Sequence, residues 1–181
     1  MDIQRETIRH LLASLAYRTQ KAIRGAGADF PDFSAGHGVR TPIQLIRHMS
    51  DVIGYARTFF IGGIFRAEPL SSFAEEVERF HFLLGDLSAH LAAGTAIKEI
   101  SLTQLMQGPV ADAMTHAGQL ALLRRLAGLP VPSENFIFAE ISADNLGSNQ
   151  PLPAAPDSIL LGKIIHLSWR LRKFFKPTKP Q

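Results

Sequence analysis

Apolar residues recur along most of the chain at the three- and four-residue spacing of amphipathic helices. The first such stretch runs from about Ile3 to Arg24 and is followed by Gly25 and Gly27, and glycine is common directly after the C-terminus of a helix. Its apolar positions fall on one side of a helix: Ile8, Leu11, Leu12, Leu15, Ala22 and Ile23. We therefore predict a first helix over this stretch.

The second helix has the clearest start signal in the chain. Thr41 is suited to cap the helix, Pro42 fits its first position, and Gln44 completes a capping box. Apolar positions continue at helical spacing as far as Phe60, and Gly62-Gly63 follows. These signals predict a helix that begins at Pro42 and ends at the glycine pair.

Two more helices follow in the middle of the chain. Ser72 and Glu75 form a second capping box, and the apolar pattern after them continues to Gly94. A fourth helical pattern ends at Gly128. Its start is open to two interpretations, because Gly108-Pro109 suits either the beginning of a helix or a kink inside a longer one.

The C-terminal part has a different composition. Residues 129–156 are rich in Pro, Asn, Ser and Gly and predict a long ordered loop, and a last helix is predicted over about 157–175. Four long amphipathic helices without strand patterns predict an all-α four-helix bundle over about 3–128. We expect one domain over 1–181, with the loop and the C-terminal helix added to the bundle.

Composition narrows the class of protein. Apolar residues make up 46% of the chain and charged residues 19%, as in folded globular proteins. Cysteine is absent, which excludes disulfides and thiolate metal sites. The first residues include Asp2 and Glu6 rather than the apolar segment of a signal peptide, and no apolar run approaches the ~18 residues of a membrane span. We expect a cytoplasmic protein without a membrane partner.

The net charge of +3 comes from the C-terminal end of the chain. From Ser158 onward there are six basic residues and no acidic ones, whereas the rest carries 13 basic against 16 acidic residues. Nucleic-acid binding needs an extended basic face that follows the phosphates. The sequence offers no such face, so we do not expect a nucleic-acid partner.

The fourth helix brings a carboxylate and an imidazole to one face. At 100° per residue, Asp112 and His116 lie 40° apart, within the stripe predicted from Leu120, Leu123 and Leu126 to be buried. Polar groups buried without partners cost several kcal/mol. The two residues therefore either share one cation or form a hydrogen-bonded pair within the helix. A third interpretation makes Asp112 an acid favoured by the helix start.

The second helix contributes another histidine. His48 lies on an apolar stripe with Leu45, Val52 and Phe59. A single histidine on such a face is more often a hydrogen-bonded core residue than a ligand. Together with Asp112 and His116, however, it forms a candidate site for a divalent metal ion. Four residues are candidates to orient the ligands or a bound water: Tyr17, Asp51, Tyr55 and Gln119. His81 is predicted at the boundary of the third helix's apolar stripe, in a structural or surface role.

Two segments resemble a known family. The run Asp112–Leu120, followed by Leu123–Gly128, resembles the signature helix of DinB/YfiT-like proteins. In that helix a His, three residues, a second His and Gly-Gln-Leu precede a Leu-Arg…Gly ending. The segment Thr41–Met49 is similar to the family's second helix, which supplies the first ligand. The resemblance covers roughly two-thirds of the chain.

The resemblance implies a metal site with one altered ligand. The family's site has three histidines in a four-helix bundle and binds nickel, zinc or a similar ion. His48 matches the first ligand and His116 the last, and Asp112 takes the place of the middle histidine. Two imidazoles and a carboxylate favour Fe(II) or Mn(II) more than three imidazoles do, and they also suit zinc.

The resemblance also implies a function. Family members include metal-dependent transferases and isomerases that use low-molecular-weight thiols such as mycothiol, bacillithiol or glutathione. We thus expect a metal-dependent enzyme with a small-molecule substrate, a thiol-dependent S-transferase or a related activity, and a homodimer. The alternative is a non-enzymatic helical interaction protein with a structural or lost metal site. Its contact surface would consist of apolar residues around Gly62-Gly63: Phe59, Phe60, Ile61, Ile64 and Phe65.

Overall fold

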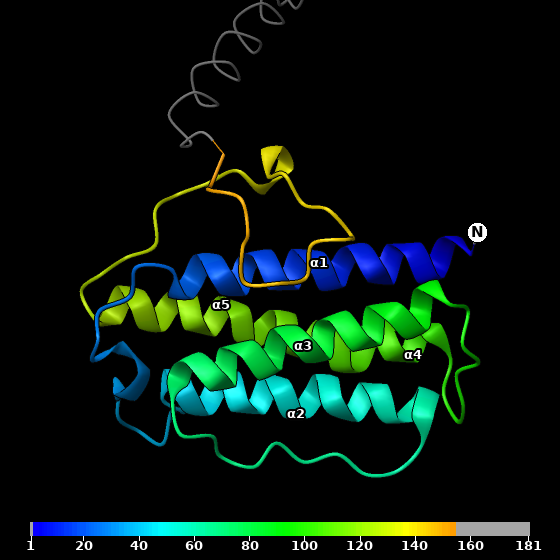
Figure 1. Cartoon of the computed structure of the whole chain (residues 1–181). Helices are drawn as coiled ribbons and strands as arrows, with labels where there is room; N and C mark the ends of the chain where they lie inside the picture. Colours follow the sequence, from blue (N-terminus) through cyan, green and yellow to red (C-terminus); the bar gives the residue numbers. More distant parts are fainter. Residues whose placement is uncertain (1, 155–181) are drawn as a thin grey trace, which may run out of the picture. The chain divides into compact units, whose positions relative to one another are not determined.

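A computed structural model describes residues 2–154 of the chain. Residues up to Val131 form one compact unit together with Ile141–Pro151. In this unit four long helices pack together as a bundle (Figure 1). They are α1 (Ile3–Ile23), α2 (Pro42–Ile61), α3 (Phe73–Ala92) and α5 (Ala111–Leu126). Residues 2–154 contain no strand, which confirms the predicted all-α bundle.

The second unit begins with Pro132–Glu140 and resumes at Leu152. Its described residues include a 3-10 turn, Phe136–Phe138, and the Ala154 backbone N–H donates to Glu134 Oε1 at 3.1 Å. The predicted C-terminal helix over 157–175 lies outside the described residues. Among the described helices, none combines the length and the apolar character needed to cross a membrane.

Each long helix packs on two neighbours. α1 contacts α3 and α5, and α2 contacts the same two helices, so the apolar faces of all four meet in one core. α2 and α3 run in the same direction, and the link between them returns along the length of the bundle (Figure 1). A helix of this length spans about 30 Å, a distance that an extended link of about ten residues can cover.

Both predicted capping boxes are present. The Thr41 backbone N–H donates to Gln44 Oε1 at 3.0 Å at the start of α2. At the start of α3, the Ser72 N–H donates to Glu75 Oε2 at 3.0 Å and Ser72 Oγ accepts from the Glu75 N–H at 3.2 Å. These bonds satisfy backbone donors that have no partner inside the helix. Short-range sequence signals thus set the starts of two bundle helices.

The fourth helical segment is longer than the pattern after Pro109 alone. It begins with α4 (Leu102–Leu105), passes through a π-helical turn (Met106–Val110) and continues as α5. Pro109 has no N–H to donate to the carbonyl of Leu105, and the turn widens around it. Of the two interpretations left open by the sequence, the structure contains the kinked helix.

Arg124 forms hydrogen bonds that connect the C-terminal ends of α1 and α5. Its side chain is 5% exposed and donates to the carbonyl oxygens of Ala22 and Arg24, both at 3.0 Å, and of Leu129 at 2.9 Å. Carbonyls at a helix C-terminus lack partners within the helix and carry its partial negative charge. No sequence pattern predicted this role, because the two acceptors at the end of α1 are about 100 residues away.

Two acidic residues hold the link between α2 and α3. Glu76 is fully buried and accepts from Arg47 Nε at 2.7 Å and from the Leu70 backbone N–H at 2.9 Å. It also forms an ion pair with Arg79. Asp51 on α2 accepts a hydrogen bond from the backbone N–H of Ala67. Hydrogen bonds from the backbone at Ala67 and Leu70 therefore hold the link against α2 and α3.

An aromatic ring of the same link packs directly on the backbone of α2. A Cβ atom added to Gly54 would lie 2.1 Å from the ring of Phe65, so only glycine leaves room for this contact. Phe65 is partly buried against the core, and Phe60 is buried, at 4% exposure. Of the apolar residues proposed for an interaction surface, these two therefore belong to the fold. Ile64, at 99% exposure, faces solvent.

Replacing Gly54 by alanine is expected to lower the free energy of unfolding by about 1–3 kcal/mol, because the new methyl group displaces the Phe65 ring. The matched control is Gly85→Ala on α3, where a Cβ meets nothing within 4 Å. This control should raise the unfolding free energy by about 0.5–1 kcal/mol through helix propensity. Urea denaturation measures both changes. Equal effects of the two substitutions would contradict the packing argument.

His81 is buried rather than at a boundary position. Its side chain is 6% exposed, and Nδ1–H donates to the Leu146 carbonyl at 2.7 Å. Leu146 belongs to the segment Ile141–Pro151, which is also bonded to α1 through Arg9 and Asp144 at 2.9 Å. The helical wheel placed His81 at the boundary because it took no account of this distant segment.

Burial lowers the pKa of His81, and the hydrogen bond to Leu146 opposes this shift only in part. The unfolded chain therefore takes up a proton at a higher pH than the folded chain. We expect the unfolding free energy to fall as the pH drops from about 6.5 through the lower pKa of the folded protein. His81→Asn, which keeps a donor but cannot titrate, should flatten this dependence in metal-free protein. His10→Asn, at an exposed position, should leave it unchanged.

Candidate metal centre

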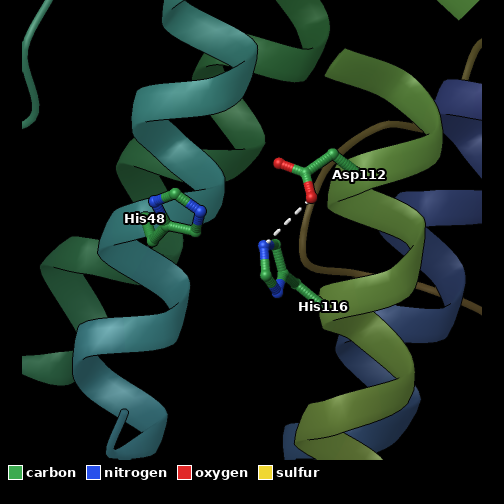
Figure 2. A group of neighbouring side chains, drawn as sticks. All are labelled: His48, Asp112 and His116. Carbon is green, nitrogen blue, oxygen red and sulfur yellow. Dashed lines mark ion pairs between the residues drawn. The ribbon is translucent and has the colours of Figure 1, made fainter. Parts of the chain in front are cut away.

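Three side chains from two helices face one another inside the bundle. Figure 2 shows His48 on α2 opposite Asp112 and His116 on α5. Each residue offers one ligand atom, and these atoms all lie within 4.8 Å of one another. The packing of α2 on α5 creates this convergence, since His48 is more than 60 positions away from the other two residues in the sequence. The three predicted ligands thus form one cluster.

The three side chains differ in burial. His116 is 8% exposed and His48 is half-buried, whereas the Asp112 side chain is 49% exposed. Asp112 therefore does not occupy the core position predicted for it. The buried face of α5 is centred on Leu120 and includes Ala113, Ala117 and Arg124, and Leu126 of the predicted stripe is 57% exposed. The predicted stripe was based on leucines, whereas the face that α5 packs on its neighbours also contains small alanines. The predicted stripe therefore lay too close to Asp112.

The hydrogen bonding of His116 leaves one nitrogen without a partner. Nδ1 lies 2.8 Å from Gln119 Oε1, and because an amide oxygen only accepts, Nδ1 carries the hydrogen. Nε2 is buried and has no hydrogen-bond partner among residues 2–154, although Asp112 Oδ1 lies 3.3 Å away. In the neutral ring, the Nε2 lone pair thus faces a carboxylate oxygen. A positive charge between the two atoms would turn this repulsion into attraction.

His48 is prepared to act as a neutral ligand. Burial is the main cause that lowers its pKa, followed by the positive charge of Arg40 and by His116, while Asp112 and Asp51 oppose the shift. A neutral imidazole is the form that binds metal ions. The rings of His48 and His116 lie edge to face, with centroids 4.7 Å apart. The lowered pKa keeps the His48 ring in this neutral, ligand form.

The spacing of the donor atoms fits a small divalent ion. Two ligands about 2.0–2.2 Å from a tetrahedral ion lie roughly 3.3–3.5 Å from each other. The 3.3 Å between His116 Nε2 and Asp112 Oδ1 falls in this range. The three ligand atoms lie within 4.8 Å of one another. Two atoms bound to one ion at about 2.1 Å can be at most about 4.2 Å apart. A small adjustment of the side chains would let all three reach one ion.

The residues predicted to support the ligands have different roles in the structure. Gln119 hydrogen-bonds to His116 and fixes its orientation. Asp51 bonds to the backbone of Ala67, and its charge still acts on His48. Tyr55 is exposed, with its ring edge to face with Phe59, and Tyr17 is buried in the core on α1.

A cavity of about 570 Å³ opens beside Asp112. The cavity is lined by α2 through Val52 and Tyr55, by the π-helical turn through Gln107 and Pro109, and by α5 through Thr115. A cavity of this size accommodates a small molecule. The exposed carboxylate therefore borders a space large enough for a substrate. The sequence did not indicate Gln107 as a lining residue, because it belongs to the π-helical turn.

Comparison with protein-family models, with curated proteins and with solved structures found no match. The resemblance to the DinB/YfiT-like family accordingly stays a prediction from the sequence. The described residues show a helical bundle in which two histidines and an aspartate are placed to hold a metal ion.

Proposed function

We propose that the protein is a divalent-metal-dependent enzyme of the DinB/YfiT-like type, with His48, Asp112 and His116 as the ligands. The observation that carries the proposal is the buried Nε2 of His116, which has no hydrogen-bond partner in the described part of the chain and lies 3.3 Å from a carboxylate oxygen. A cation explains both features, because it accepts the lone pair and balances the carboxylate charge. The resemblance of the two ligand-bearing helices supports the same assignment.

The chemistry follows from three protein ligands. A divalent ion held by three residues keeps open positions, at which it lowers the pKa of a bound thiol or water. Gln119 holds His116 in the tautomer that presents Nε2 to the ion. The cavity beside Asp112 offers room for a small-molecule substrate. We propose thiol-dependent S-transfer with a low-molecular-weight thiol as the reaction, on the basis of the family resemblance.

The first experiment measures metal binding by EDTA-treated protein. Zn²⁺, Ni²⁺, Mn²⁺ and Fe²⁺ are titrated separately by calorimetry, and bound metal is counted by elemental analysis. We expect one ion per chain and a rise in Tm, because an ion that binds only the folded state stabilises it. Lack of binding by all four ions would overturn the metal site and leave the interaction protein as the better hypothesis.

The second experiment tests catalysis on the metal-loaded protein. Glutathione, bacillithiol and mycothiol are each combined with monochlorobimane, and product formation is followed by fluorescence. We expect metal-dependent turnover with at least one thiol. A protein that binds one ion but is inactive with every thiol and electrophile tried would have a structural metal, which is the alternative function.

That alternative has one observation in its favour. Ile64 is 99% and Ile61 48% exposed at the end of α2, and exposed apolar residues of this kind often belong to contact surfaces. We propose a homodimer that buries them. Light scattering of the wild type and of Ile64→Asp tests this, and a monomeric wild type at high micromolar concentration would contradict it.

A further inference from the structure

A second cavity lies on the other side of the metal centre, between the loop before α2 and the last turns of α5. Its volume is about 600 Å³, which is within the range of small-molecule sites. We call it the Arg40 pocket and define it by six of its lining residues: Val39, Arg40, Leu45, Gln119, Leu122 and Leu126. No residue that lines it is acidic.

Arg40 is the one charged residue among the described residues that line this pocket, and it is exposed. Within residues 2–154 it takes part in no ion pair and no hydrogen bond. Its positive charge nevertheless lowers the pKa of His48, so it lies close enough to the metal centre to act on it. A guanidinium without a partner at the edge of an apolar cavity is suited to bind a carboxylate or a similar anion.

Apart from Arg40 and Gln119, the side chains that line the pocket are apolar. Leu122 and Leu126 lie one turn apart on α5 and are 55% and 57% exposed, and Val39 in the facing loop is 49% exposed. Large side chains of this kind, grouped on one face, mark surfaces that a ligand or partner covers. One charged group beside such a wall is complementary to a molecule with an anionic head and an apolar tail.

The pocket shares a wall with the metal centre. Gln119 lines the pocket and also hydrogen-bonds to His116, and Leu45 lies one turn before His48 on α2. The cavity beside Asp112 is therefore lined by one of the ligands, and the Arg40 pocket is lined by the residue that hydrogen-bonds to another. A reaction between two molecules needs two such spaces next to one ion.

We infer that the Arg40 pocket binds an amphipathic monoanion, whose carboxylate or sulfonate pairs with Arg40 and whose apolar tail lies on Leu122 and Leu126. Binding itself depends only on the pocket. The statement that this molecule is the second reactant of the enzyme rests on the proposed function. The two can be tested separately, because binding is measurable on protein without metal.

The test uses sodium decanoate on EDTA-treated full-length protein, with calorimetry for affinity and methyl NMR for location. We expect saturable binding with shifts at Val39, Leu122 and Leu126, and weaker binding of 1-decanol and decylamine. Arg40→Gln should weaken decanoate binding by about three- to tenfold. Arg66→Gln, at an arginine 84% exposed on the link between α2 and α3, should not change it.

Several results would overturn the inference. These are no binding up to millimolar decanoate, equal affinity of Arg40→Gln and wild type, or methyl shifts outside the pocket. Light scattering is run on the same samples, and a dimer that loses its contact in Leu126→Asp would assign this face to a second copy of the chain instead. A further outcome is that the protein binds decanoate and yet binds none of the four metal ions in the titration above. That result would support the pocket and refute only the metal centre.

Discussion

His116→Ala is expected to abolish stoichiometric binding of a divalent ion and the rise in Tm that accompanies it. The substitution removes the buried ligand nitrogen and leaves His48 and Asp112 as the only ligands of the cluster. Loss of an outer partner of a metal ligand costs about 10–100-fold in affinity, so loss of a ligand should cost more than about 100-fold. Calorimetry with Zn²⁺ and thermal unfolding with and without the ion measure the effect.

Two further variants separate a lost ligand from a damaged fold. Gln119→Leu removes the hydrogen bond to His116 Nδ1 and should weaken binding by about 10–100-fold without abolishing it. His10→Ala changes an exposed histidine on α1 and should have no effect. If His116→Ala bound Zn²⁺ as tightly as the wild type, the ion would have to lie elsewhere.

Asp112→His tests the identity of the second ligand. The side chain is about half exposed, so the larger ring has room. Three imidazoles favour zinc and nickel over manganese. The variant should therefore retain one ion per chain and show a larger ratio of Ni²⁺ to Mn²⁺ affinity than the wild type. An unchanged ratio would show that residue 112 does not reach the ion.

Glu76→Ala is expected to have the largest effect on stability, a loss of about 3–5 kcal/mol of unfolding free energy. The carboxylate is fully buried and receives Arg47, Arg79 and the Leu70 N–H. Its removal leaves two arginines and a backbone donor of the link between α2 and α3 without their acceptor. Urea denaturation followed by circular dichroism measures the loss.

Glu78→Ala is the matched control, because it changes an exposed glutamate on the same helix and should alter stability by less than about 0.5 kcal/mol. Since the Glu76→Ala protein is expected to be close to unfolding, Glu76→Gln is measured as well. The amide keeps one acceptor and should cost about 1–3 kcal/mol. A Glu76→Ala protein as stable as the control would contradict the role given to the buried carboxylate.

The helices and the identity of the candidate ligands follow from local patterns in the sequence. The capping boxes at Thr41 and Ser72 predicted the starts of α2 and α3, because their hydrogen bonds join residues only three positions apart. The i, i+4 spacing of Asp112 and His116 likewise follows from the helix repeat. Each of these features depends on neighbouring residues and needs no knowledge of the fold.

Contacts between distant segments account for what the patterns missed. Asp112 is exposed because the packing of α5 on its neighbours turns the buried face toward Ala113 and Ala117, and His81 is buried because the segment Ile141–Pro151 covers it. The same holds for Arg124, which donates to two carbonyls at the end of α1, and for the cavities on either side of the candidate metal centre. Whether a side chain is buried, and which polar groups it contacts, depends on which segments pack together in space. Helical periodicity does not contain that information.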